Sequence, residues 1–350
     1  MTTKIGRLRL VTMVCMLLTG CGGPTVPAAV TGGPAGGNPP PSPGFTLTLG
    51  TLRMTGGQDA LCPPGQVCQG IEVSCPGMIR TIPGFVAVAN PATTPRGVVV
   101  FTTGSGGENY ALGGGDRDTL LQQLRADGFR VVQLRWDANW LEADRGADAG
   151  TARLACRPAT AFKWIHATHF LPLGIAQSPN GRCGFCITGN SGGASQVSYA
   201  LSHYGLDDIL DAVIPTGGPP HGALTKACLR RPGEERYWFA DDTRQFIDRG
   251  FGIYDDGPCF RSDPSFSARW DQESIVTGGS DYAHQTTRIH FIVGELDRSG
   301  VLGPAEDYAA RLRASGSTWV SMEIAAGTPH GVLGSAVGRN AVRAALLTTR

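Results

Sequence analysis

The stretch FCITGNSGGASQVSYALSHYG, residues 185–205, joins a short apolar run to a helical pattern through a glycine-rich turn. FCITG predicts a buried strand, and GASQVSYALSHYG predicts a helix. Between them, Gly189-Asn190-Ser191-Gly192-Gly193 has the pattern GxSxG in the strand–turn–helix context that presents a serine hydroxyl clear of its neighbours. We therefore expect Ser191 to be a nucleophile. A glycine-rich turn that binds phosphate, or that only packs tightly, is the alternative interpretation.

The same alternation of short apolar runs and helical patterns extends on both sides of this turn. Predicted strands are GVVVF (97–101), VVQLRW (131–136), DAVIPT (211–216), RIHFIV (288–293) and TWVSMEI (318–324), with helices in TLLQQLRADG, AFKWIHATHFL, AEDYAARLRA and from about Val332. Strands that are buried on both faces and joined by crossover helices predict an α/β fold. We expect a doubly wound, mostly parallel sheet with helices on both faces.

The alternation stops between about 221 and 285, where ten aromatic residues occur without a strand–helix rhythm. An insertion at this point predicts a lid over the carboxyl ends of the strands, where open α/β sheets hold their ligands. The alternative is that these aromatic side chains only form the insertion's own small core, stapled by a disulfide between Cys228 and Cys259. The sequence leaves both possibilities open.

A serine nucleophile needs a base, and the base should follow a strand late in the chain. His330, in Thr328-Pro329-His330-Gly331, follows the last predicted strand and precedes the last helix. The carboxylate that orients the imidazole should follow the preceding strand, where Gly294-Glu295-Leu296-Asp297 offers two acids. We favour Asp297, because the loop must leave the strand before a carboxylate can turn toward the histidine. Glu295 then bonds the loop's backbone.

The chain order Ser191, Asp297, His330 resembles that of the α/β-hydrolases, and residues 85–350 are similar to bacterial esterases and lipases. The resemblance implies an oxyanion hole built from the N–H of Gly192 and one from the loop 102–107, with Ser105 the first choice and Gly104 the second. This loop lacks the usual His-Gly start, and a flexible hinge is the alternative for it.

The resemblance further implies a serine hydrolase that cleaves small or polymeric carboxylic esters through an acyl-enzyme, without a cofactor. A peptidase or a polyester depolymerase would use the same side chains. A catalytically silent, surface-tethered binding protein on the same fold is the alternative from a different class.

Other histidines are weaker candidates for a functional site. His166 and His169 lie three apart on one predicted helix, and we expect a solvent-facing helix surface rather than a metal site. His221 follows DAVIPT and should lie near the rim of the site without a catalytic role. The sequence contains no P-loop, GxGxxG or HExxH, so no metal or nucleotide is predicted.

The N-terminus predicts export. A basic stretch ending at Arg9 precedes the apolar run LVTMVCMLLTG, so residues 1–20 predict a signal peptide. Leu18-Thr19-Gly20-Cys21 resembles the lipobox of bacterial lipoproteins, which implies lipidation of Cys21 and a membrane anchor in the periplasm or at the cell surface. An ordinary secretory signal is the alternative. Residues 21–44 are rich in Gly and Pro and predict a tether.

The remaining chain, 45–350, predicts one hydrolase domain with a Cys-rich N-terminal elaboration over 45–84. Eight cysteines lie beyond Cys21, and an even number in an exported chain predicts disulfides rather than a zinc site. Without the three basic residues of the signal peptide, 27 basic residues face 29 acidic ones, a net charge of −2. This balance gives no electrostatic basis for binding nucleic acid.

Overall fold

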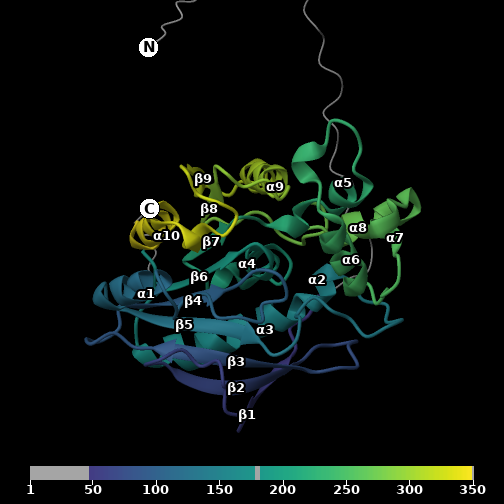
Figure 1. Ribbon diagram of the computed structural model, residues 1–350. Coiled ribbons are helices and arrows are strands. Elements are labelled where there is room, and N and C mark those ends of the chain that lie inside the picture. The colour runs from purple at the N-terminus through teal and green to yellow at the C-terminus, as the bar shows by residue number, and fades with distance from the viewer. Residues whose placement is uncertain (1–46, 178–181, 349–350) are drawn as a thin grey trace, which may run out of the picture. The chain divides into compact units, whose positions relative to one another are not determined.

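The computed structural model of the chain describes residues 47–177 and 182–348 (Figure 1). These residues contain a nine-stranded sheet with the order β1-β2-β3-β5-β4-β6-β7-β8-β9. The strands are β1 Thr51–Thr55, β2 Val67–Ser74, β3 Ile82–Ala89, β4 Gly97–Thr102, β5 Phe129–Trp136, β6 Phe185–Asn190, β7 Ala212–Thr216, β8 Arg288–Gly294 and β9 Val320–Ala325. The proposed signal peptide, Cys21 and the whole predicted tether lie outside the described residues.

Strand direction divides the sheet into two parts. Strands β4 to β9 run parallel, whereas β1, β2 and β3 pair antiparallel with one another and β3 pairs antiparallel with β5. The antiparallel part comes from the N-terminal elaboration and ends in the short edge strand β1. The predicted doubly wound, mostly parallel sheet is confirmed.

Helices cover both faces of the sheet. They are α1 Arg117–Ala126, α2 Thr151–Leu154, α3 Cys156–Ile165, α4 Gly192–Ser202, α5 Leu224–Leu229, α6 Asp241–Gly250, α7 Pro258–Arg261, α8 Ser267–Glu273, α9 Leu302–Ala314 and α10 Ala336–Leu347. Along β4, Val98 and Val100 pack in one apolar core with α3, α4 and α9, while Val99 and Phe101 pack in the other with α1 and α10. Because side chains alternate along a strand, a continuous apolar run fills both cores.

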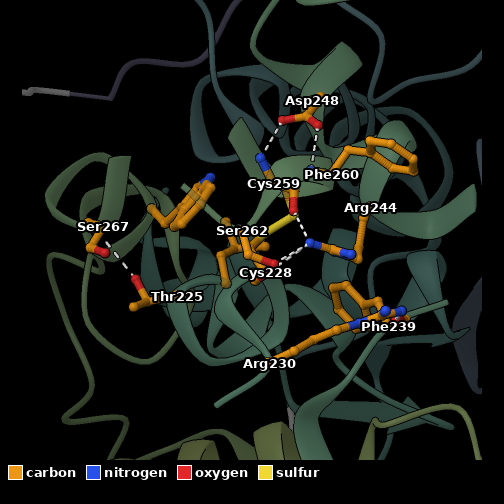
Figure 2. The surroundings of a disulfide bond; sticks show 12 residues. Thr225, Cys228, Arg230, Phe239, Arg244, Asp248, Cys259, Phe260, Ser262 and Ser267 are labelled. Atoms are coloured by element: carbon orange, nitrogen blue, oxygen red, sulfur yellow. Dashed lines mark hydrogen bonds between the residues drawn. A yellow bond between two sulfur atoms is a disulfide. The ribbon is translucent and has the colours of Figure 1, made fainter. Parts of the chain in front are cut away.

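The insertion between β7 and β8 forms a group of short helices, α5 to α8 (Figure 1). The disulfide between Cys228 and Cys259 joins α5 to α7, which is the pairing named in the alternative interpretation of the insertion. Figure 2 shows how α6 supports this disulfide: the Asp248 carboxylate accepts hydrogen bonds from the backbone N–H groups of Cys259 and Phe260, both at 2.9 Å. The Arg244 guanidinium donates to the carbonyl oxygens of both cysteines. The insertion therefore has a core of its own.

Three further disulfides join Cys62 to Cys68, Cys75 to Cys156 and Cys183 to Cys186. All eight cysteines beyond Cys21 are thus paired, which confirms the disulfide set predicted from their even number. The bridge from Cys75 to Cys156 fastens the antiparallel strands to α3. Within 47–177 and 182–348, no helix is both long enough and apolar enough to cross a membrane.

Candidate active site

Ser191 occupies the sharp turn between β6 and α4. Its backbone has φ 55° and ψ −118°, a conformation that costs free energy for a residue with a Cβ atom. The Ser191 N–H donates to the carbonyl oxygen of Thr216 at 2.9 Å, which fixes the turn to β7. The serine side chain therefore leaves the sheet at the carboxyl edge of its central strands, at the first turn of a helix whose N-terminus favours negative charge.

Close packing explains two of the glycines around Ser191. A Cβ atom on Gly189 would lie 2.2 Å from the Thr102 Oγ1 atom of the adjacent strand. A Cβ atom on Gly193 would lie 2.8 Å from the carbonyl oxygen of Thr103. Neither position can hold a larger residue without moving β4, so the GxSxG pattern follows from the approach of α4 and β6 to the neighbouring strand.

His330 and Asp297 come from two loops at the same edge of the sheet. His330 lies on the loop after β9 and Asp297 on the loop after β8, and His330 Nδ1 is 2.7 Å from Asp297 Oδ2. The other carboxylate oxygen, Oδ1, accepts the Ser299 backbone N–H at 2.9 Å and the Ser299 hydroxyl at 2.5 Å. Burial raises the pKa of Asp297, but the hydrogen bonds from His330 and Ser299 outweigh burial, so this pKa lies below its ordinary value. The carboxylate is therefore charged at neutral pH.

Glu295 has a different partner. Its Oε2 atom accepts the backbone N–H of Gly327 at 2.8 Å, in the loop that leads from β9 to His330. Glu295 thus holds the histidine loop by its backbone, and the structure places Asp297 against the imidazole.

Asn190, the residue before Ser191, joins the serine turn to the histidine loop. Its Oδ1 atom accepts the backbone N–H of Val332 at 3.1 Å and the Thr216 hydroxyl at 3.2 Å. Sequence reasoning missed this residue, because the second position of GxSxG is unspecified and its partner lies 142 positions away. Asn190 therefore joins the serine turn to the loop that carries His330.

A cavity of about 490 Å³ opens at this edge of the sheet. Ser191, His330, Gly192 and Ser105 all line it, so four of the residues predicted from the sequence meet at one surface. Gly104 lies directly behind Ser191, since a Cβ atom on it would lie 3.1 Å from the serine Cβ atom. A substrate carbonyl in this cavity would meet the serine, the imidazole and two backbone segments together.

The loop 102–107 is anchored rather than free. The carbonyl oxygen of Gly107 accepts the backbone N–H of Trp136 at 2.8 Å, and the carbonyl oxygen of Gly106 accepts the backbone N–H of Trp140 at 3.1 Å. Ser105 has φ 49° and is exposed to the cavity. These hydrogen bonds argue against the flexible-hinge alternative, and Ser105, unlike Gly104, lines the cavity.

The insertion supplies another wall of the cavity. Phe239, Phe246 and Arg249 line it, from α6 and the segment before it. Other aromatic side chains of the insertion pack on one another, with Phe266 in edge-to-face contact with Phe251 and Trp270. Some aromatic side chains of the insertion therefore line the cavity, and others form the internal core given above as the alternative to a lid.

Five histidines outside the His330 loop are buried, namely His166, His169, His203, His221 and His284. His221 lines the cavity, and burial lowers its pKa to about 3, so it is a neutral part of the wall at ordinary pH. The expectation that His166 and His169 face solvent is wrong, since their exposed fractions are 7% and 9%. His166 packs edge-on against the ring of Phe185 in β6, which shows that this face of the helical segment meets the sheet.

Comparison with known proteins shows the fold. The chain is similar to a solved arylesterase with 17% identity and a TM-score of 0.50, over 82% of this chain and 87% of that one. It is also similar to an acylaminoacyl peptidase solved with Z-Gly-Gly-Phe-chloromethyl ketone, with 15% identity and a TM-score of 0.52, over 80% of this chain and 40% of the peptidase. Searches against protein-family models and curated protein sequences found no match. The sheet and these two structures together show an α/β-hydrolase fold.

Proposed function

We propose that this protein is a serine hydrolase that cleaves carboxylic esters through an acyl-enzyme, with Ser191 as nucleophile, His330 as general base and Asp297 as the orienting acid. The observation that carries the proposal is the meeting of a strained serine and a carboxylate-bound imidazole in one cavity. A turn that served only for packing would not need a histidine and a carboxylate from two other loops beside it.

The contacts of His330 support the following proton steps. His330 Nδ1–H donates to Asp297, so Nε2 is the nitrogen free to accept the Ser191 proton as Oγ attacks the ester carbonyl. The resulting oxyanion would be stabilised by the backbone N–H groups of Gly192 and Ser105. His330 then returns the proton to the leaving alcohol, and the acyl-enzyme forms. Water, deprotonated by His330, attacks the acyl-enzyme and releases the acid and free Ser191.

Apolar side chains at the cavity favour esters with an apolar acyl or aryl group. Phe239 and Phe246 line the wall of the cavity, and we infer that the insertion acts as a lid over the bound acyl chain. An arylesterase and a peptidase share this fold, so a direct test must decide whether the leaving group is an alcohol or an amine. The same serine, histidine and aspartate can cleave either bond.

A panel of substrates with the purified domain tests the proposal. The acyl length of the p-nitrophenyl esters is varied from two to about ten carbons, which the apolar wall of the cavity can contact. We expect hydrolysis of these esters and no comparable turnover of the matching p-nitroanilides. Ser191→Ala should abolish hydrolysis of the esters. Ser198→Ala is the matched control, because the Ser198 hydroxyl is buried on α4 and has no hydrogen-bond partner in the described parts of the chain. Faster cleavage of the anilides would indicate a peptidase, and folded protein without turnover would indicate a binding protein.

We also propose that the protein is exported and anchored through a lipid on Cys21, on the basis of the sequence alone. Cys21→Ser should move the protein from the membrane fraction to the soluble fraction without changing ester hydrolysis by the domain. Unchanged membrane retention of this variant would refute the anchor.

A further inference from the structure

Three potential metal ligands lie together at the end of α4 that is farthest from Ser191. Asp207 belongs to a short 3₁₀ turn, Leu206–Asp208, and Asp281 and His284 belong to the segment between α8 and β8. One ligand atom from each side chain lies within 4.8 Å of the other two. Nothing in the proposed hydrolase chemistry uses these residues, because α4 spans 11 residues and so separates them from Ser191 by about 16 Å.

The imidazole of His284 is fully buried, and one of its nitrogens lacks a hydrogen bond. Nε2 lies 3.2 Å from the Ser202 hydroxyl, which itself lies 2.6 Å from the Tyr308 hydroxyl. Nδ1 has no hydrogen-bond partner among the described residues. Leaving a buried polar atom unpaired costs about 1–3 kcal/mol. A ligand at Nδ1 would remove this cost.

The distance from His284 Nδ1 to the nearest carboxylate fits a shared cation better than a direct bond. Nδ1 lies 3.7 Å from Asp207 Oδ2, which is too far for a hydrogen bond. Two ligands bound tetrahedrally to one zinc ion, each at about 2.0–2.2 Å, lie about 3.4 Å apart. The two atoms therefore need to move only a few tenths of an ångström, about 0.3 Å, to bind the same ion.

Asp281 completes the set from the solvent side. Its Oδ1 atom accepts the Ala283 N–H at 2.7 Å, and its own N–H donates to the Ser202 carbonyl oxygen at 3.2 Å. These bonds hold the carboxylate beside the buried imidazole and leave one face of the site open to water. A zinc ion commonly combines three such protein ligands with one water molecule.

We propose that Asp207, Asp281 and His284 bind a divalent transition-metal ion of the zinc class, with His284 Nδ1 as the nitrogen ligand. Ser202 holds the second ring nitrogen, as an outer partner of a metal-bound histidine does. The ion joins the end of α4 to the segment that leads from the insertion into β8. Its role is structural, because it ties two segments distant in sequence at the edge of the sheet opposite the cavity.

Metal binding by the purified domain, residues 45–350, tests the proposal. Protein treated with a chelator and freed of it should bind one zinc ion per chain in isothermal titration calorimetry, and zinc should raise the midpoint of thermal unfolding. Asp281→Asn keeps an oxygen for the Ala283 N–H but removes the charge, and because Asp281 is a direct ligand it should weaken zinc binding by at least about 10–100-fold, the cost of losing an outer partner. Asp208→Asn is the matched control, because Asp208 is adjacent but faces Lys163 at 3.4 Å.

Either of two zinc results, or equally tight binding of calcium, would overturn the inference. One is a chelated, folded wild-type protein that shows no saturable zinc binding. The other is zinc binding that Asp281→Asn and Asp207→Asn leave at the wild-type level. Calcium that binds as tightly as zinc would also contradict it, since calcium takes oxygen ligands and gains nothing from His284. Ester hydrolysis is measured on the same samples and should be the same with and without zinc.

Discussion

Replacing Asp297 with asparagine should switch the tautomer of His330. Oδ1 of Asp297 faces two donors from Ser299, the backbone N–H at 2.9 Å and the hydroxyl at 2.5 Å. In Asp297→Asn the amide oxygen keeps this position, which places the amide NH₂ group against His330 Nδ1. The amide then donates to Nδ1, and the imidazole proton moves to Nε2. His330 in this tautomer has no lone pair directed at Ser191.

The expected loss is large because the variant keeps the shape of the site and reverses one hydrogen bond. A triad with the wrong tautomer loses about 10⁴-fold in kcat, which corresponds to about 5.4 kcal/mol of transition-state stabilisation. The change in folding stability should be smaller, about 1.5–3 kcal/mol for a hydrogen bond to a charged group. The variant should therefore be folded and nearly inactive.

Steady-state hydrolysis of a p-nitrophenyl ester measures this loss, with circular dichroism as the check on folding. Glu295→Gln is the matched control, because a glutamine oxygen can still accept the Gly327 N–H. It should keep activity within about threefold, less than 1 kcal/mol. If Asp297→Asn stayed within tenfold of wild type while Glu295→Gln lost its activity, the assignment of the acid would be refuted.

Three further predictions concern stability and pH. Cys228→Ser opens the disulfide to Cys259, which closes a loop of 31 residues, and urea unfolding should show a loss of about 3–4 kcal/mol. Asp59→Asn removes the buried carboxylate that lies 2.6 Å from the Arg135 guanidinium and leaves only the exposed Asp137 at 3.3 Å, so the same assay should show a loss of about 3 kcal/mol, the lower end for breaking a buried pair. Burial raises the pKa of Asp297, but its hydrogen bonds lower this pKa by more, so the pKa in the folded protein lies below the ordinary aspartate value. The carboxylate therefore contributes its full stabilisation above the ordinary aspartate pKa, and this stabilisation is lost as the pH falls through the lower pKa of the folded protein. The unfolding free energies of wild type and Asp297→Asn should therefore converge in acid; a difference that grew as the pH fell would contradict the assigned direction.

Local chemistry made part of this architecture predictable. The run 185–189, the glycines around Ser191 and the helical pattern after it all act within about ten residues, so the strand–turn–helix unit and its serine follow from the sequence. His330 and Asp297 could be proposed because loops after parallel strands meet at one edge of the sheet.

Contacts between distant segments could not be predicted in the same way. The bond from Val332 to Asn190 depends on the path of the histidine loop, which no local pattern records. The burial of His166 and His169 depends on which face of their helical segment meets β6, and a pair of histidines three apart is compatible with either face. The antiparallel pairing of β3 with β5 likewise depends on where the N-terminal strands join the sheet.

The covalent adduct formed with a fluorophosphonate tests the central claim most directly, because this reagent reacts with a serine only where a neighbouring base activates it. Intact-protein mass spectrometry followed by peptide mapping should find one adduct per chain, on Ser191, that is absent from Ser191→Ala and forms much more slowly in Asp297→Asn. Folded, oxidised wild-type protein that forms no adduct, or forms it on another serine while Ser191 stays unmodified, would contradict the account.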